Sequence, residues 1–286
     1  MTQNEQVIYV SSLAFLGMSA EEMIQTAQQH DYAVEFSSGL PYREDMEAVY
    51  LQAPVKKIPH NYFPAPAIPF VLNLASANPE IRQRSITHCI QGLRLAREAG
   101  APFFSAHAGF CIDPDPEHLG RKLPQNIPYD REEHWSLFKD SLRQLLDVAD
   151  RYGIDFLIEN NVVAAMNLWE DGSHPLFCAD AEDIVRLLEE MQHPRLGILL
   201  DTAHWKVSSR ALSFDQDGDL QKIKMYIRGI HHSDNDGTLD TNKPIGKEYW
   251  FLPHLKSFLA VPHVLEVKKQ SPSEIDVQLS LLQMQQ

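Results

Sequence analysis

Four residues that can bind a metal each follow a short apolar run in this sequence. They are Glu159 after Phe-Leu-Ile, Asp201 after Ile-Leu-Leu, His231 after Gly-Ile and Glu266 after Val-Leu. Short apolar runs bounded by turn residues are typical of buried parallel strands, whose carboxyl ends meet at one edge of a sheet or barrel. Because a carboxylate is costly to bury without a partner, packing alone does not explain these residues. We therefore predict that two glutamates, an aspartate and a histidine bind one metal ion.

Carboxylate and imidazole donors favour a divalent ion; we expect Mn²⁺, with Mg²⁺, Co²⁺ and Zn²⁺ also compatible. An ion with open coordination positions can chelate the adjacent carbonyl and hydroxyl oxygens of a sugar, and it then stabilises an enediolate. A carboxylate must remove the proton from the neighbouring carbon. We expect Glu159 and Glu266 to form this acid/base pair, one removing the proton and the other returning it.

Other side chains are candidates for contacts to a substrate. His60 and His107 end two further predicted strands. They could bind a second metal, contact substrate hydroxyls or bond to a backbone carbonyl. Phe110 and Trp205 carry aromatic rings that could stack on the apolar face of a sugar.

Side chains alternate between the two faces of a strand, and this alternation predicts which of the remaining candidates face the barrel interior. His231 and His232 are adjacent, so only one of them can face the barrel interior, and we choose His231. Lys268 shares the side of Glu266, where it could bind a substrate carboxylate or phosphate, offset the charge of Glu266 or remain in solvent. Glu35 ends another predicted strand and faces the same mouth, where it could contact a substrate, but we expect it to form a salt bridge with a loop lysine or arginine.

Eight predicted strands position these residues. The first four span 7–10, 33–36, 55–60 and 102–107, and the last four end near the predicted metal ligands. Helices are expected over 19–30, 78–100, 130–152 and 180–191, with less regular stretches at 220–224 and 253–259. Alternating strands and helices predict a parallel sheet, and eight such units in 286 residues favour one α/β domain, a (β/α)8 TIM barrel over residues 1–286. A Gly-x-Gly-x-x-Gly motif does not follow the first strand, which argues against a dinucleotide-binding fold.

Two long connections, 61–77 and 108–128, follow predicted strands. Loops of this length in a compact domain are usually functional or disordered, and the loops after the strands of a TIM barrel build its active site. We therefore expect both segments to form walls of a pocket.

The composition narrows the range of partners and compartments. The 25 basic and 39 acidic residues give a formal charge of −14, which disfavours non-specific nucleic-acid binding. Cys89, Cys111 and Cys178 form no Cys-x-x-Cys pair and fit a reducing compartment. The amino terminus, residues 1–6, is polar, and no segment approaches the roughly 20 apolar residues of a membrane span. We expect a soluble cytoplasmic protein without membrane contact.

The ordered motifs resemble one known family. They are Glu-Asn at 159–160, Leu-Asp-Thr-x-His at 200–204, His-x-Ser-x-Asn-Asp at 231–236 and Leu-Glu at 265–266. This order is similar to that of the xylose isomerase-like TIM-barrel family of sugar isomerases and epimerases, most closely its tagatose 3-epimerase branch. The resemblance implies that Glu159, Asp201, His231 and Glu266 are the metal ligands, and that His204 reaches a substrate oxygen.

Endonucleases that cut at abasic sites belong to the same superfamily, and this chain resembles them further through His60 and His107. Those histidines are extra zinc ligands in the endonucleases. That family also has an Asp-x-His pair after its seventh strand, which the stretch 240–243 here lacks. Epimerases of the family often have an arginine after Asn-Asp, where this chain has Gly237.

The prediction is a divalent-metal-dependent isomerase or epimerase that moves a proton beside a ketose carbonyl, or a close variant such as a polyol-ketone dehydratase. The alternatives are a metal-dependent phosphodiesterase that resembles the abasic-site endonucleases and a non-catalytic sugar- or metal-binding protein. The expected partner is a small sugar, phosphorylated or neutral, and a homo-oligomer is compatible with the resemblance.

Overall fold

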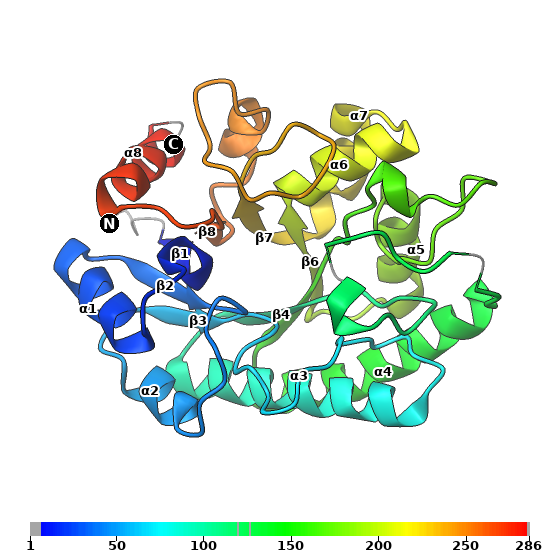
Figure 1. Cartoon of the computed structure of the whole chain (residues 1–286), viewed down its shortest axis with the longest axis horizontal. Helices are drawn as coiled ribbons and strands as arrows, with labels where there is room; N and C mark the ends of the chain where they lie inside the picture. The colour runs from blue at the N-terminus through cyan, green and yellow to red at the C-terminus, as the bar shows by residue number, and fades with distance from the viewer. Residues whose placement is uncertain (1–6, 119, 126, 285–286) are drawn as a thin grey trace.

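The computed structural model describes residues 7–118, 120–125 and 127–284, and the polar amino terminus predicted over residues 1–6 lies outside them. Eight parallel strands curl into a nearly closed barrel surrounded by helices (Figure 1). The strands are β1 (Ile8–Ser11), β2 (Ala33–Phe36), β3 (Lys57–Pro59), β4 (Phe103–His107), β5 (Asp155–Glu159), β6 (Leu196–Asp201), β7 (Ile227–His232) and β8 (His263–Leu265). The prediction of a TIM barrel is confirmed.

The hydrogen-bonded order of the strands is β3-β2-β1-β8-β7-β6-β5-β4, so closure depends on β3 and β4. A parallel bridge joins His60 to Ser105 there. The backbone N–H of Asn61 also donates to the Ser105 carbonyl at 3.0 Å. These contacts bring the ends of β3 and β4 together at the mouth of the barrel.

Helices and short 3₁₀ turns connect the strands. The helices are α1 (Ala20–His30), α2 (Met46–Gln52), α3 (Pro79–Ala99), α4 (Arg131–Tyr152), α5 (Ala181–Met191), α6 (Thr202–Leu212), α7 (Gln216–Ile223) and α8 (Pro272–Gln283). The expected stretch at 220–224 is the end of α7 with the beginning of a 3₁₀ turn, and that at 253–259 is a 3₁₀ helix over Leu252–Ser257. The sequence patterns did not predict α2, α6 or α8.

Capping residues set the ends of the longest helices. The Asn78 side chain accepts from the N–H of Glu80 at 2.9 Å and begins α3, and Gly100 ends it with φ of 69°. The Asp130 side chain begins α4, and Gly153 ends it with φ of 72°. A positive φ is easily adopted by glycine, so these boundaries could be read from the sequence.

A close approach joins α3 to β4. A Cβ atom added at Gly92 would lie 2.2 Å from Cε2 of Phe104. The Phe104 ring is fully buried among the helices and strands. Glycine at this position therefore allows the helix to lie directly on the barrel.

The carboxylate of Glu190 links α4 to α5. It accepts from Nε1 of Trp135 at 3.0 Å, from Nζ of Lys139 at 2.5 Å and from Nε of Arg186 at 2.8 Å. Lys139, Arg186 and Trp135 together lower the pKa of Glu190 to about 2.

Of the helices in the described ranges, none is both long and apolar enough to cross a bilayer.

Replacing Gly92 with alanine should destabilise the protein. Alanine has the better helix propensity by about 1 kcal/mol, whereas overpacking a core costs about 1–3 kcal/mol. Because the Phe104 ring is buried, the steric cost should dominate, and urea denaturation should show a net loss of about 1–2 kcal/mol. The control Gly246→Ala adds a Cβ with no atom within 4 Å and should change stability by less than about 0.5 kcal/mol. An unchanged stability in Gly92→Ala would contradict the packing.

A second prediction concerns the pH dependence of stability. Because the folded pKa of Glu190 lies near 2, below its ordinary value of 4.5, its contribution is present above pH 4.5 and is lost as the pH falls toward 2. The carboxylate is 34% exposed, so solvent screens it, and Glu190→Gln should cost about 0.5–1 kcal/mol at pH 7. Urea titrations at pH 7, 5, 4 and 3 should show the difference from wild type shrinking only at the acidic end. A difference that is constant over this series would contradict the ion-pair network.

Candidate metal centre

The carboxyl ends of β5 to β8 bring four side chains together. The parallel register aligns Asp201 with His231, and Glu266 follows β8 directly. Ligand atoms of Glu159, Asp201, His231 and Glu266 all lie within 4.8 Å of one another. The four residues that the sequence analysis selected thus form one buried cluster, which we call the carboxylate cluster.

His231 is central to the carboxylate cluster. Its Nδ1 lies 3.2 Å from Oε2 of Glu266, 3.7 Å from Oε1 of Glu159 and 4.0 Å from Oδ2 of Asp201. Its Nε2 lies 2.9 Å from Oε1 of Glu35, which is fully buried. A proton on Nε2 donated to Glu35 leaves the lone pair of Nδ1 facing the three carboxylates, the arrangement of a metal-binding histidine.

The structure corrects the expectation for Glu35. Its side chain points into the barrel interior and bonds to His231, whereas a salt bridge to a loop lysine or arginine was expected. Glu35 lies on β2, which β1 and β8 separate from β7 in the hydrogen-bonded order, so the contact depends on the curvature of the sheet. The alternation of side chains along one strand predicts which face a residue is on, but it could not predict that Glu35 contacts His231 on another strand.

Buried carboxylate oxygens test whether a cation fits this cluster. Within the described part of the chain, Oδ2 of Asp201 is buried without a hydrogen-bond partner, and Oε2 of Glu159 is buried with only the ring nitrogens of His60 and His107 near it, at 3.2 and 3.3 Å. Burial raises the pKa of Asp201 well above its usual range, and Glu266 and Asp240 raise it further despite nearby His204. Buried, unpaired oxygens in an excess of negative charge are unfavourable unless a cation binds them. A divalent ion therefore fits these residues.

The pKa of Glu159 shifts in the opposite direction to that of Asp201. Burial opposes its ionisation, but His107 and His60 hold the pKa of Glu159 well below its ordinary value. Its Oε2 lies 3.2 Å from Nε2 of His60 and 3.3 Å from Nδ1 of His107. Glu159 is therefore a carboxylate at neutral pH.

His60, His107 and Glu159 form a second group of atoms within 4.8 Å of one another. The Nδ1 of His60 bonds to Oγ of Ser105 at 2.8 Å, which directs its Nε2 toward Glu159. Glu159 belongs to both groups, so it could bridge two cations. This geometry makes a second metal one use of His60 and His107.

Asn160 and the first turn of α6 hold Asp201 in place. The Asn160 side chain bonds to the backbone N–H and carbonyl of Asp201 at 2.7 and 3.1 Å. Oδ1 of Asp201 accepts from the N–H of His204 at 2.7 Å, which caps the helix and leaves Oδ2 free. Asp201 is therefore both the N-cap of α6 and a member of the carboxylate cluster.

Asp240 is a site residue that the sequence analysis did not select. Its Oδ2 lies 3.2 Å from Nε2 of His204, whose Nδ1 lies 2.9 Å from the Asn160 carbonyl. Burial opposes protonation of His204, but Asp201 and Asp240 raise its pKa well above the ordinary value. Asp240 begins the stretch compared above with the Asp-x-His pair, in which Asn242 stands in place of the histidine.

A pocket of about 560 Å³ is lined by His107 and His204, which contact Glu159, whereas the four residues of the carboxylate cluster are not among its described lining residues. His107, His204 and Asp240 form part of its polar end, and Phe110 lies on its apolar side. The prediction that the connections 61–77 and 108–128 form pocket walls is confirmed. A third wall comes from residues after β5, between Asn161 and Leu176.

Trp205 and Lys268 do not reach this pocket. The Trp205 ring is buried against Phe214, and its Nε1 donates to the carbonyl of Gln216. Since α6 begins at Thr202, neighbouring positions 204 and 205 lie about 100° apart around the helix, and only His204 faces the site. Lys268 is exposed because β8 ends at Leu265, so strand alternation does not extend to it.

Of the two adjacent histidines, His231 faces the barrel interior. His232 points away from the cluster, with Nε2 at 2.7 Å from Nδ1 of His263 and Nδ1 at 3.0 Å from the Tyr249 hydroxyl. The Tyr249 hydroxyl bonds in turn to Oγ1 of Thr202 at 2.6 Å. This buried network supports the ends of β6 and β7 from outside the barrel.

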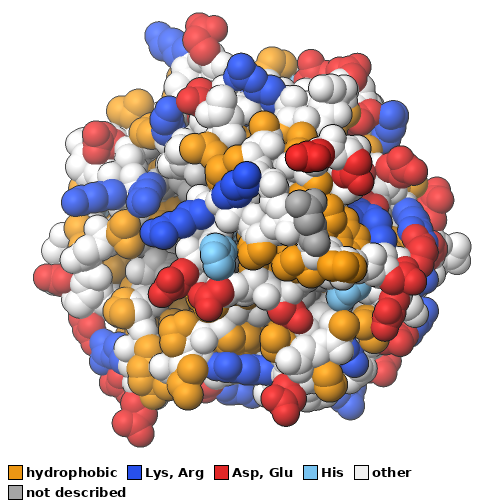
Figure 2. Space-filling view, turned by 45° about the vertical axis from the view of Figure 1, so that its right-hand side comes forward, with side chains coloured by type: hydrophobic (Ala, Val, Ile, Leu, Met, Phe, Trp, Pro, Cys, Tyr) orange, Lys and Arg blue, Asp and Glu red, His pale blue; other side chains and the backbone are white. Residues whose placement is uncertain are grey.

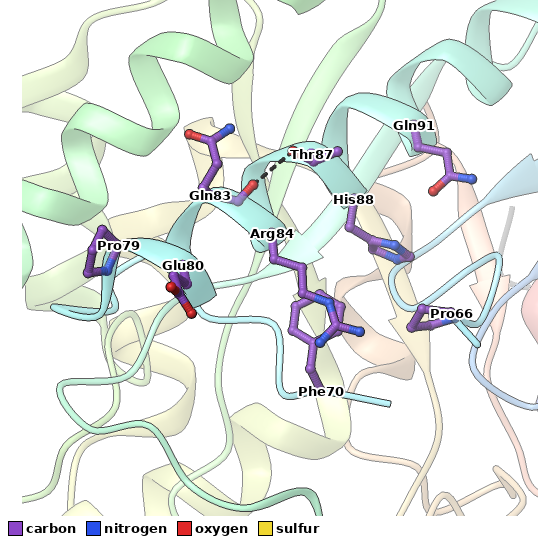
Figure 3. A pocket seen from close by; sticks show the side chains of 9 residues that line it. All are labelled: Pro66, Phe70, Pro79, Glu80, Gln83, Arg84, Thr87, His88 and Gln91. Carbon is purple, nitrogen blue, oxygen red and sulfur yellow. Dashed lines mark hydrogen bonds between the residues drawn. The ribbon is translucent and has the colours of Figure 1, made fainter. Parts of the chain in front are cut away.

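A shallower groove of about 600 Å³ lies on the outer face of α3 (Figure 3). There the Arg84 guanidinium lies over the Phe70 ring at 4.0 Å, and His88 packs beside the same ring. Phe70 lines both this groove and the pocket of about 560 Å³. The stacked arginine therefore fixes one wall of the pocket from outside.

A closed parallel barrel with a buried carboxylate–histidine cluster at the carboxyl ends of its strands defines a TIM-barrel protein with a metal-competent site. A family model described as xylose isomerase-like TIM barrel matches residues 16–264. The chain therefore belongs to the xylose isomerase-like TIM barrel family.

Individual relatives are distant. The chain is 25% identical to a protein named probable endonuclease 4 from Mesomycoplasma hyopneumoniae (strain 7448), over 69% of this chain and 67% of that protein. A D-tagatose 3-epimerase-like protein has a TM-score of 0.71 at 16% identity, covering 97% of each chain. The TTHB071 protein from Thermus thermophilus, soaked with ZnCl₂, has a TM-score of 0.63 at 21% identity, covering 96% of this chain and 97% of that one. At these identities the structural matches establish the fold alone.

Removing the charge of Glu35 should weaken metal binding. Partners that orient a metal-binding histidine typically contribute 10- to 100-fold in affinity, so Glu35→Gln should raise the Kd for Mn²⁺ or Zn²⁺ by about 10-fold or more. Isothermal titration calorimetry of metal-free protein measures this. Glu44→Gln, an exposed matched control, should bind as wild type does. Equal affinities in folded Glu35→Gln and wild type would contradict the role of Glu35.

Proposed function

We propose that this protein is a divalent-metal-dependent isomerase or epimerase that transfers a proton next to a ketose carbonyl. The observation that supports it most directly is the convergence of two glutamates, Glu159 and Glu266, with Asp201 and His231, next to the pocket residues His107 and His204. The D-tagatose 3-epimerase-like structural neighbour agrees with this reaction class.

The four residues of the carboxylate cluster would hold the metal ion, and its two glutamates would also transfer the proton. A divalent ion held by Glu159, Asp201, His231 and Glu266, for which we propose Mn²⁺, would supply Lewis acidity toward the substrate carbonyl and its adjacent hydroxyl. Burial opposes ionisation of Glu266, but His231 lowers its pKa, so Glu266, like Glu159, can accept a proton at neutral pH. The Glu266 side chain is 13% exposed and that of Glu159 is 1% exposed. We therefore assign Glu266 to the more accessible side of the substrate and Glu159 to the deeper side.

His107 and His204 are the proposed contacts to substrate oxygens. Both line the pocket, and both lie next to Glu159, at 3.3 and 3.5 Å. A hydroxyl bound between them would hold the substrate carbon near the carboxylates. Such positioning is itself a large part of catalysis, because it removes the entropic cost of bringing the groups together.

A second candidate is metal-dependent phosphodiester hydrolysis. It is favoured by the shared carboxylate of Glu159 in the His60–His107–Glu159 group and by the relatives named probable endonuclease 4. The charge of −14 argues against it, and Figure 2 shows basic side chains sharing one face with acidic and hydrophobic ones. Within the described lining of the pocket, Arg121 is the sole lysine or arginine. We therefore rank the isomerase above the hydrolase.

We further propose a cytoplasmic role in carbohydrate metabolism, in a single domain that acts on a small sugar; a homo-oligomer is compatible with this role. The buried free thiols of Cys89, Cys111 and Cys178 fit a reducing compartment. Burial raises the pKa of the Cys89 thiol above the useful range for reactivity, so this cysteine is a packing residue.

Replacing Glu159 with glutamine should abolish proton exchange. Without a carboxylate at this position, exchange of the substrate C–H with solvent deuterium should fall by about 10²–10⁴-fold, measured by NMR with Mn²⁺-loaded protein and ketoses such as D-fructose and D-tagatose. Circular dichroism should show an intact fold, and the exposed control Glu182→Gln should exchange as wild type does. Exchange at the wild-type rate in Glu159→Gln would contradict the base assignment.

The hydrolase candidate is tested on the same preparation. A DNA duplex with one abasic site should remain uncut at protein concentrations that support ketose exchange, and metal analysis should find about one tightly held ion per chain. Cleavage of the duplex together with two bound ions and no ketose exchange would reverse the ranking.

A further inference from the structure

The lining of the pocket next to the carboxylate cluster has two chemically different parts. His107, His204, Asp240 and Asn61 are polar residues of its lining. A separate part of the lining is hydrophobic, and we call it the apolar wall. It consists of Val71, Phe110, Leu123, Val162, Met166 and Leu176. Of these, Val71, Phe110, Leu123 and Leu176 belong to one buried cluster.

Buried hydrogen bonds fix the apolar wall in position. The Asn73 side chain is fully buried, accepts from the N–H of Phe110 at 2.9 Å and donates to its carbonyl at 3.1 Å. An antiparallel bridge joins Phe110 to Leu176. Oδ1 of Asn167 accepts from the N–H of Leu123 at 2.9 Å. Segments that are distant in sequence are thus tied to one another, as in a preformed ligand site.

The polar end retains an unused hydrogen-bonding group. Asn61 lines the pocket, its side chain is buried, and Oδ1 has no hydrogen-bond partner among the residues that the structure describes. A buried amide oxygen of this kind is normally satisfied by a ligand or water. A hydroxyl donor from a bound molecule would satisfy it.

The volume of the pocket and the polarity of its lining together restrict the size and polarity of the substrate. The cavity of about 560 Å³ lies within the range of roughly 300–1,000 Å³ that accommodates drug-sized ligands. A free ketose has a hydroxyl on nearly every carbon, and hydroxyls against the apolar wall would lose their water without gaining partners. A small, uniformly polar sugar would therefore leave the apolar wall without a partner.

We propose that the substrate is amphipathic: a ketose-type head that binds at the His107–His204 end and carries an uncharged apolar acyl or aryl group, which lies against the apolar wall. The identity of the head rests on the proposed function, whereas the apolar group rests on the wall alone. A charged substituent such as phosphate is disfavoured at the apolar wall, because Arg121 is the one lysine or arginine of the described lining and its side chain is exposed.

Calorimetry with Mn²⁺-loaded protein tests this inference with three probes: D-fructose, 6-O-benzoyl-D-fructose and fructose 6-phosphate. Burial of the phenyl ring should make the benzoyl ester bind about 10- to 100-fold more tightly than fructose. Met166→Gln, which is nearly isosteric, should reduce this advantage several-fold without changing the affinity for fructose. Met225→Gln is the matched control, since Met225 is 79% exposed and does not line the pocket.

The outcomes separate the inference from the proposed function. An ester that binds no more tightly than fructose, an advantage that persists unchanged in both Met166→Gln and Val162→Thr, or tighter binding of the phosphate would overturn the apolar substituent. Deuterium exchange is read independently on the same samples. Exchange without a benzoyl advantage contradicts only the inference, whereas a benzoyl advantage without exchange in any ketose contradicts only the proposed function.

Discussion

The burial of several carboxylates in one small volume is the constraint on which this structure depends. Within the carboxylate cluster, burial and nearby acidic groups raise the pKa of Asp201, while His107 and His60 lower that of the adjacent Glu159 despite its burial. The histidines therefore offset the burial of Glu159, whereas the burial of Asp201 is not offset by His204. A divalent cation shared by Glu159, Asp201, His231 and Glu266, whose ligand atoms lie within 4.8 Å of one another, would neutralise the negative charge of the carboxylates.

Several side chains each use one polar atom in a hydrogen bond to the scaffold and keep a second polar atom that could bind a cation. Asp201 commits Oδ1 to the N-terminus of α6, His231 commits Nε2 to Glu35, and His60 commits Nδ1 to Ser105. In each case the remaining atom faces the cluster. This arrangement preorganises the site, because the orientation of the ligands is set by the fold before any cation binds.

Features that depend on local patterns could be predicted from the sequence, and those that depend on contacts between distant segments could not. Apolar runs located the strand ends that carry Glu159 and Asp201, and capping residues located α3 and α4. The partner of Glu35 lies on a strand far away in sequence, and Asp240 enters the site through an irregular loop. Trp205 was misassigned because helix α6 begins immediately after Asp201, so consecutive residues diverge around the helix axis.

The pocket adds information that the carboxylate cluster alone lacks. The cluster defines a reaction class, since many substrates can present oxygens to a metal. Phe110, Met166 and the other residues of the apolar wall restrict which molecules can approach it. Chemistry and selectivity are thus supplied by different parts of the chain, the first by strand ends and the second by the connections that follow them.

The central claim is that four strand-end side chains hold one cation, and anomalous diffraction from crystals grown with Mn²⁺ and without chelator tests it most directly. The account predicts a manganese peak bound by Glu159, Asp201, His231 and Glu266 together. A cation bound elsewhere, with these four side chains turned toward separate hydrogen-bond partners, would contradict it.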